Sequence, residues 1–192
     1  MRMFVAVLPP SDALEDLAEF MAPRHEAEPG FRWTVPEQWH VTLAFLADVA
    51  ERHLDDLVAR LERAAARRTR FRVTLASGGA FPNAARAKVL FVDVETEGVE
   101  LRRLATGARA AATKAGAAPE GGPFHPHITL ARTRRPVEAT RWLRVLDAYR
   151  GPEWQVDEIA LVASHLGEGP RKRPRYEVVE TFPLGTAHSN SN

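Results

Sequence analysis

Two short stretches of the sequence each place a histidine and a threonine two residues apart. The first reads HVTLAF and begins at His40, and the second reads HITLAR and begins at His127. In a β-strand, residues i and i+2 point to the same face, roughly 6.5–7 Å apart. Each stretch therefore presents one imidazole and one hydroxyl together. Because imidazoles exchange protons near neutral pH and hydroxyls donate hydrogen bonds, two such pairs could form an acid–base site that grips an anion.

The two stretches belong to an internal repeat with a constant offset. Position 127 lies 87 residues after position 40, and the run FVDV at position 91 lies 87 residues after FVAV at position 4. Two matches at one offset indicate a duplicated unit with halves at about 1–87 and 88–186. No Gly/Ser-rich or Pro-rich linker separates the halves. We therefore expect a single domain over 1–186 in which the halves share a core, followed by a flexible tail at 187–192.

Each half is predicted to run strand, helix, strand, helix, strand. The β-branched runs MFVAVLP and KVLFVDVE indicate the first strands, and helical periodicity follows each of them. The histidine motifs fall in the next strands. This order predicts an α+β fold with two antiparallel sheets that face each other across a central cleft, with helices outside. A pseudo-twofold axis would bring the two motif strands to equivalent places in the cleft.

A third histidine, His125, lies close to the second motif. It precedes Pro126, where the backbone is biased to extended or turn geometry. His127 has a partner at the repeat offset, and His125 has none. We therefore expect His127 to act in the cleft and His125 to lie at its rim.

Composition narrows the class of protein. The chain has 192 residues, a net charge of +1 and no cysteine, so disulfides, thiolate metal sites and a cysteine nucleophile are excluded. No apolar run approaches the roughly 18 residues of a membrane helix, and the N-terminus does not resemble a signal peptide. No set of metal ligands is complete, since the pair His125 and His127 lacks a third partner. We expect a cytoplasmic, monomeric protein without a metal ion or cofactor.

The paired motifs HVTL (40–43) and HITL (127–130) resemble the two H-x-T-x motifs of the 2H phosphoesterase superfamily. The runs FVAVLPP, HVTLAFL, PFHPHITLAR and VASHL, with a Tyr-containing last strand, narrow the resemblance to its RNA 2′,3′-cyclic phosphodiesterase branch. This bacterial and archaeal branch has also been called 2′-5′ RNA ligase. The resemblance covers about residues 2–185. Ala47 departs from the pattern, because many relatives have glycine there, at a turn beyond the motif strand.

The resemblance implies hydrolysis of RNA 2′,3′-cyclic phosphate ends to 2′-phosphates without a metal, and in some members weak 2′-5′ joining of RNA ends. The implied partner is an RNA with a 2′,3′-cyclic phosphate end. Carried over by position, His40 is the proton donor, His127 is the proton acceptor, and Thr42 and Thr129 bind the phosphate. Relatives often place an arginine at position 132 near the substrate. Strict strand alternation puts Arg132 on the opposite face, so it reaches the phosphate only if its strand bends or ends there.

The chemistry of the residues agrees with this reading. Opening a cyclic phosphodiester requires one group to activate water and another to protonate the departing alkoxide. A positioned acid or base typically contributes about 10²–10⁴-fold. Two other functions stay open: a non-catalytic RNA- or nucleotide-binding module, and a phosphodiesterase for small cyclic nucleotides or ADP-ribose 1″,2″-cyclic phosphate. A binding module would not need both imidazoles.

Several other residues have no assigned role in the sequence. We expect His165 at the surface rather than in the cleft. Of the basic runs at 67–72, 132–135 and 171–175, the last is the best candidate for phosphate contacts, because Pro174 makes it a loop before the final strand. Among the aromatic residues, Phe124 is the best candidate for stacking on a base, because it is adjacent to the second motif.

Overall fold

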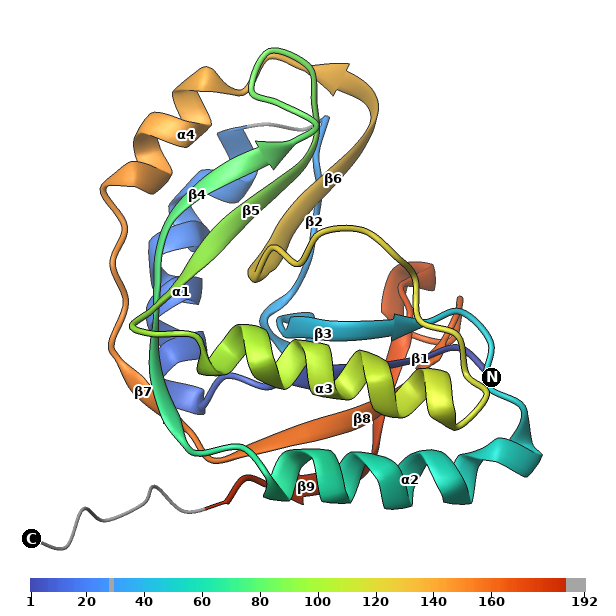
Figure 1. The fold of residues 1–192 in the computed structure, drawn as a ribbon. Helices are drawn as coiled ribbons and strands as arrows, with labels where there is room; N and C mark the ends of the chain where they lie inside the picture. Colours follow the sequence, from blue (N-terminus) through green and yellow to red (C-terminus); the bar gives the residue numbers. More distant parts are fainter. Residues whose placement is uncertain (28–29, 186–192) are drawn as a thin grey trace, which may run out of the picture.

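The computed structural model describes residues 1–27 and 30–185, and its strands form two antiparallel sheets (Figure 1). The first sheet has the order β3-β1-β8-β9, and the second has the order β2-β6-β5-β4-β7. The strands are β1 (Met3–Val7), β2 (Arg32–Trp33), β3 (Val41–Leu46), β4 (Phe71–Phe81), β5 (Ala87–Thr96), β6 (His127–Val137), β7 (Trp154–Val156), β8 (Glu158–His165) and β9 (Arg175–Pro183). The predicted α+β class with two antiparallel sheets is confirmed. The predicted tail at 187–192 lies outside the described residues.

Four α-helices cover the sheets within the described chain: α1 (Ser11–Met21), α2 (Glu51–Ala66), α3 (Glu100–Lys114) and α4 (Thr140–Asp147). Short 3₁₀ turns occur at Ala22–Ala27, Pro36–Gln38 and Pro170–Lys172. Each α-helix buries one apolar stripe, as the 3.6-residue period requires. Helices α2 and α3 lie side by side against the first sheet, and α4 packs on β4 of the second (Figure 1). None of the helices in the described part is long and apolar enough to cross a membrane.

Each sheet is built from both halves of the repeat. In the first sheet β8, from the second half, pairs with β1, and in the second sheet β4, from the first half, pairs with β5. The orders β3-β1-β8 and β6-β5-β4 match strand for strand, which is the pseudo-twofold relation that the repeat predicts. The halves at 1–87 and 88–186 therefore do not coincide with the two sheets. The second half supplies β8 and β9 to the first sheet, and the first half supplies β2 and β4 to the second, which explains why the sequence has no linker between the halves.

A β-bulge occurs at the same place in both motif strands. The neighbouring residues Ala6 and Val5 of β1 pair with Thr42 and Ala44 of β3, so Leu43 is the extra residue in β3. The neighbouring residues Phe91 and Leu90 of β5 pair with Thr129 and Ala131 of β6, so the extra residue is again the leucine after the threonine, Leu130. A bulge shifts the alternation of side chains by one position. In both strands two consecutive residues, Leu-Ala, are therefore buried.

Candidate active site

The two motif strands meet at a cleft of about 410 Å³ between the sheets. All five site residues expected from the sequence line this cleft: His40, Thr42, His127, Thr129 and Arg132. Val41 and Ile128, which alternate with them, are buried on the other face of their strands. The cleft is therefore polar where the repeated His-Thr pairs converge.

The ring of His40 is held on three sides. Its Nδ1–H donates to the carbonyl oxygen of Gln38 at 2.7 Å. The ring stacks on Phe4, with centroids 4.3 Å apart, and it meets the edge of Tyr176 at 5.4 Å. Because a carbonyl oxygen can only accept, Nδ1 carries the proton, and Nε2 is the nitrogen left for a substrate.

The ring of His127 is held in the same way by the second half of the repeat. Its Nδ1–H donates to the carbonyl oxygen of His125 at 2.6 Å, two positions back, as His40 bonds to Gln38. Phe91, which lies 87 residues after Phe4, packs against the ring at 5.2 Å. The repeat thus preserves the hydrogen bond that fixes the tautomer and the aromatic support of the ring.

The surroundings lower the pKa of both imidazoles. Burial lowers the pKa of His40 to about 4; the hydrogen bond to Gln38 opposes this, and the charges of Arg132 and of His127 in its protonated form add to the lowering. Burial also lowers the pKa of His127, against the hydrogen bond to His125 and the charge of Asp93. Both rings are therefore neutral at pH 7 in the free protein. An anion in the cleft would raise both pKa values, because it favours the protonated forms.

The two threonines leave their hydroxyls available in the cleft. Within the described chain, no hydrogen bond occupies the hydroxyl of Thr42 or of Thr129. The strands that carry the two threonines are held by hydrogen bonds to backbone carbonyl oxygens at the bulges. The Thr34 hydroxyl donates to the carbonyl oxygens of Thr129 and Leu130 at 2.7 and 3.0 Å, and Arg109 Nε donates to that of Leu43 at 3.3 Å. Carbonyl groups that a bulge frees from the strand ladder are thus partnered by side chains.

The bulge also decides the position of Arg132. The strand β6 does not end there but continues to Val137, and the bulge at Leu130 is the local bend that the expectation required. After the extra residue, Arg132 returns to the face of Thr129 and lines the cleft. Phe45 occupies the equivalent place on β3. One wall of the cleft therefore carries a guanidinium and the other an aromatic ring.

The two remaining histidines of interest lie outside the cleft lining. His125 is exposed and donates from Nε2 to Asp93 Oδ1 at 2.7 Å, beside the ring of His127. His165 lies in a surface cluster, 3.1 Å from Glu177 and 3.4 Å from Glu168. Both positions agree with the rim and surface locations expected from the sequence.

The basic run at 171–175 reaches the cleft at Pro174. Pro174 lines the cleft, and its carbonyl oxygen accepts from the Gln38 amide at 3.2 Å. Arg173 donates to the carbonyl oxygen of Trp33 at 3.0 Å, and Arg175 pairs with glutamates. Two of the four cations expected to contact phosphate, Arg173 and Arg175, are thus already bonded to other groups of the protein.

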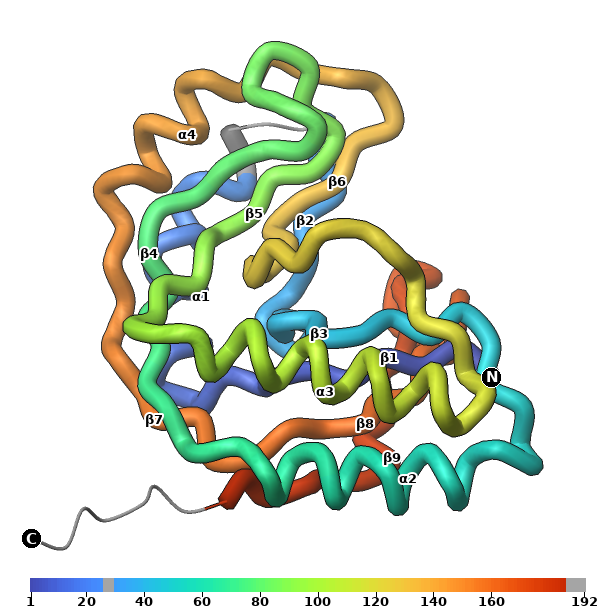
Figure 2. Tube along the Cα trace, viewed as in Figure 1, coloured from blue at the N-terminus to red at the C-terminus, as the bar shows by residue number. Residues whose placement is uncertain are grey.

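Some residues of the cleft had no signal in the sequence. Phe124 packs against the core, and it is Phe45 that lines the cleft, with Arg2 stacked 4.4 Å above its ring. Glu120 also lines the cleft, because the chain between α3 and β6 passes close to β3 (Figure 2), where the Glu120 amide donates to the Phe45 carbonyl at 2.9 Å. Arg2 and Glu120 belong to no repeated motif, so spacing could not identify them.

The described residues contain no cluster of three or more potential metal ligands.

Comparison with known proteins gives one consistent match. Residues 8–168 match the model of the 2′-5′ RNA ligase superfamily. The chain is 37% identical to an RNA 2′,3′-cyclic phosphodiesterase of Thermus thermophilus, over 98% of this chain and 92% of that protein. It is 28% identical to the Escherichia coli protein of the same name, over 95% and 96%.

Solved structures agree with the sequence relatives. A crystal structure of a Thermus thermophilus protein has a TM-score of 0.80 and 36% identity, and the match covers 98% of this chain and 100% of that one. E. coli LigT in its apo form has a TM-score of 0.77 and 27% identity, with coverage of 96% and 97%. LigT complexed with 3′-AMP has a TM-score of 0.76. The similarity extends over nearly the whole length of each chain.

Proposed function

Because the chain belongs to the 2′-5′ RNA ligase superfamily, we propose that it hydrolyses the 2′,3′-cyclic phosphate at an RNA end and leaves a 2′-phosphate. One observation carries the proposal: two imidazoles with fixed tautomers line one cleft, each with Nε2 available. A non-catalytic binding module would have no use for two such nitrogens. The names of the relatives, RNA 2′,3′-cyclic phosphodiesterase, support the choice of substrate.

The proposed reaction is an in-line displacement at phosphorus. One imidazole takes a proton from water as the new P–O bond forms, and the other gives a proton to the 3′-oxygen as its bond to phosphorus breaks. Thr42, Thr129 and Arg132 line the cleft and would donate to the nonbridging oxygens, where negative charge increases. With charge and protons supplied by these side chains, the step requires no metal ion. A 5′-hydroxyl in place of water would give a 2′-5′ linkage, and this is the weak ligation that we propose as a side reaction.

We assign His40 as the proton donor and His127 as the acceptor, as the family resemblance implies. In the free protein the electrostatics alone favour the reverse order. Burial holds the pKa of His40 near 4, whereas the charge of Asp93 opposes the lowering at His127. The proposed order therefore requires the bound phosphate to raise the pKa of His40.

A substrate with a much more acidic 3′ leaving group separates the two orders. Such a leaving group no longer needs protonation, so it should largely rescue His40→Ala and leave His127→Ala inactive. Rescue of His127→Ala alone would exchange the roles. A 3′-phosphate product would contradict the assumed orientation of the substrate.

The function itself is tested with purified protein and an oligonucleotide that ends in a 2′,3′-cyclic phosphate. We expect conversion to a 2′-phosphate end, unchanged by excess EDTA. Parallel reactions with cyclic mononucleotides and with ADP-ribose 1″,2″-cyclic phosphate measure the preference for RNA. Loss of turnover in EDTA with recovery in Zn²⁺ or Mn²⁺ would contradict the two-histidine mechanism. Binding of all these ligands without turnover would favour the non-catalytic module.

A further inference from the structure

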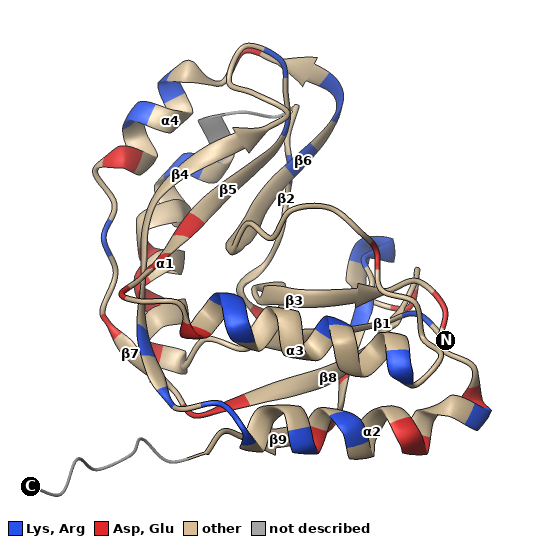
Figure 3. Ribbon diagram, viewed as in Figure 1, with Lys and Arg blue, Asp and Glu red and all other residues tan. Residues whose placement is uncertain are grey.

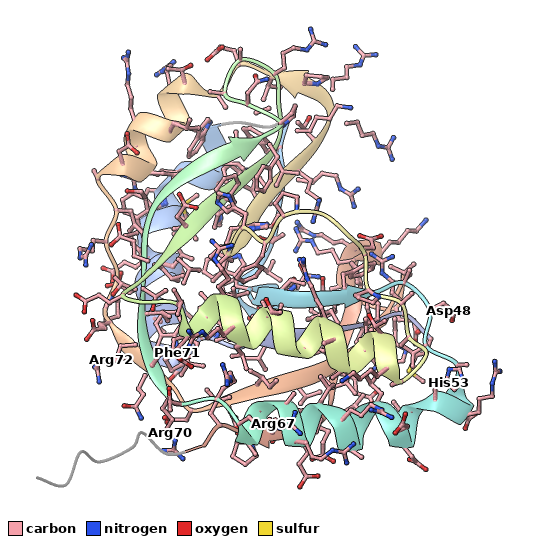
Figure 4. All side chains as sticks on the ribbon, viewed as in Figure 1. Asp48, His53, Arg67, Arg70, Phe71 and Arg72 are labelled. Atoms are coloured by element: carbon pink, nitrogen blue, oxygen red, sulfur yellow. The ribbon has the colours of Figure 1, made fainter. Side chains whose placement is uncertain are left out.

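A second concave surface, outside the cleft, is rich in positive charge. It has a volume of about 680 Å³ and is lined by residues of α2 and α3 and of the segments next to them. The two helices lie side by side (Figure 1). We call this surface the α2–α3 groove. Seven basic residues line it, and among the described residues no acidic one does: Arg60, Arg63, Arg67, Arg68, Arg102, Arg103 and Lys114. Figure 3 shows blue segments on both helices, and Figure 4 labels Arg67 at the end of α2.

Most of these cations have no ionic partner in the described chain. Two of the groove cations are paired within their helices, Arg60 with Asp56 at 2.9 Å and Arg103 with Glu100 at 3.7 Å. The other five form no ion pair in the described chain: Arg63, Arg67, Arg68, Arg102 and Lys114. Other exposed arginines of the protein do form such pairs, including those at positions 70, 72 and 150. Because the whole chain has a net charge of only +1, the groove is a local concentration of unpaired cations.

Small residues form the floor of the groove. Ala64 of α2 faces Gly107 of α3, and a Cβ added to Gly107 would lie 4.0 Å from the Ala64 Cβ. The helices thus pack on small side chains, and both helices contribute guanidinium groups to the groove. A guanidinium presents a planar fork of donors that matches phosphate oxygens.

We infer that the α2–α3 groove binds the sugar-phosphate backbone of RNA. Leu43 and Thr42 point to opposite faces of β3, toward the helices and toward the cleft respectively. The groove and the cleft are therefore on opposite sides of the first sheet, so the groove would hold phosphates remote from the reacting one. The choice of RNA over other polyanions rests on the proposed function.

The test compares two double charge reversals. The variant Arg63→Glu/Arg102→Glu alters the groove, and Arg141→Glu/Arg144→Glu makes the same charge change on exposed residues of α4. The probe is a labelled single-stranded RNA with a 3′-hydroxyl end, which binds without reacting, followed by fluorescence anisotropy across salt concentrations. For the groove variant we expect at least tenfold weaker binding. Its salt slope should fall by about 1.4, from two lost phosphate contacts at about 0.7 each.

Turnover of a cyclic mononucleotide should be unchanged in the groove variant, because that substrate reaches only the cleft. Wild-type affinity and slope in the groove variant, or an equal loss in the α4 variant, would overturn the inference. Absence of turnover in every form would contradict the proposed function but would leave the binding comparison intact.

A separate observation concerns the residues two positions before the cleft histidines. Gln38 and His125 are 87 residues apart and so are equivalent in the repeat. The backbone carbonyl of each accepts the Nδ1–H of a cleft histidine. The side chain of each is also tied to a neighbour: Gln38 donates to the Pro174 carbonyl at 3.2 Å, and His125 donates to Asp93 Oδ1 at 2.7 Å.

The side-chain partners of Gln38 and His125 differ in charge. Asp93 lies directly opposite His127 in the β5–β6 register. The position 87 residues before Asp93 is Ala6, so the repeat provides no equivalent carboxylate near His40. The residue that accepts the hydrogen bond of His127, which is His125, thus has a carboxylate as its side-chain partner. The residue that accepts the hydrogen bond of His40, which is Gln38, has a neutral carbonyl as its partner.

We infer that Asp93 and His125 are positioning residues for His127, which fix its ring and make the two sides of the cleft electrostatically unequal. The charged or titratable groups around His127 are Asp93, His125, Arg132 and, across the cleft, His40. Asp93 is the one negative charge in this set. This inference rests on the proposed function only for its consequence in catalysis.

The test measures the pKa of His127 by NMR of ¹⁵N-labelled imidazoles, which does not depend on activity. Asp93→Asn should lower this pKa, because it removes a charge that favours the protonated ring. The matched control is Glu95→Gln, two residues along β5, which removes a carboxylate that pairs with Arg150 instead. The control should leave the pKa unchanged.

His125→Ala gives a second, independent test, because it releases Asp93 while the backbone carbonyl stays in place. Both Asp93→Asn and His125→Ala should lower kcat severalfold with little change in KM and should shift the pH–rate profile. An unchanged His127 pKa in Asp93→Asn would overturn the inference. Loss of turnover in all forms, with the pKa difference retained, would count against the proposed function alone.

Discussion

At the scale of single residues, the hydrogen bonds of the histidines matter more than their spacing. Each ring donates from Nδ1 to a carbonyl two positions earlier, so each offers Nε2 to the cleft. His125 lacks this arrangement, because its Nε2 is bonded to Asp93. The same residue type therefore has different uses at positions two apart.

We predict that His40→Ala and His127→Ala each lower kcat by about 10²–10⁴-fold, the usual contribution of a positioned acid or base. His125→Ala should cost far less, because that ring only supports its neighbour. Single-turnover and steady-state rates on a cyclic-phosphate oligonucleotide measure all three. Equal losses in His125→Ala and His127→Ala would contradict the assignment from the repeat.

The lowered pKa of His40 predicts a pH-dependent stability. Its pKa is about 4 in the folded protein and about 6.5 when unfolded, so between these values the unfolded chain binds more protons. The free energy of unfolding should therefore rise with pH across this window and lose the contribution of His40 as the pH falls toward 4. Thermal unfolding of the wild type and of His40→Gln from pH 4 to 7 measures this. Parallel curves for the two proteins would show that His40 contributes nothing.

At the scale of elements, the paired bulges shape the walls of the cleft. Each motif strand contains one extra leucine, so the residue two positions after that leucine faces the cleft. This residue is Phe45 on one wall and Arg132 on the other. The carbonyls that the bulges free are bonded by Arg109 and Thr34. Local backbone irregularity, repeated in both halves, thus completes the site.

We predict that Arg132→Ala lowers kcat/KM by about 10–150-fold, because a charged hydrogen bond contributes roughly 1.5–3 kcal/mol. Arg132→Lys should recover part of this, since it keeps the charge but not the planar fork. The control is Arg135→Ala, an exposed position farther along β6 that does not line the cleft. Similar losses at 132 and 135 would indicate a general effect of charge instead of a contact.

At the scale of the whole molecule, the exchange of β4 and β8 makes the two halves depend on each other. Neither half contains a complete sheet, because each sheet takes two strands from the other half: β8 and β9 in the first sheet, and β2 and β4 in the second. An unpaired strand edge is prone to aggregation. The single domain that we propose over 1–186 follows from this interlocking.

Cutting the chain between Ala84 and Ala85 tests the interlocking. Each fragment alone should be unfolded or aggregated, and the two coexpressed fragments should copurify with restored circular dichroism. A cooperative unfolding transition in fragment 1–84 alone would show that the first half is an independent domain.

The sequence by itself determined the repeated order of the long strands and the helices, the duplication, and the four His and Thr residues that line the cleft, but not the short strands β2 and β7. These features depend on period-2 and period-3.6 patterns and on an offset, all of which are carried by neighbouring residues. Tertiary structure decided the face that Arg132 occupies, because register depends on the hydrogen bonds of the partner strand. It also decided which sheet receives β4 and β8, and it gathered the cations of α2 and α3 into one groove. Contacts between residues far apart in the chain form only when the core packs, so no local pattern encodes them.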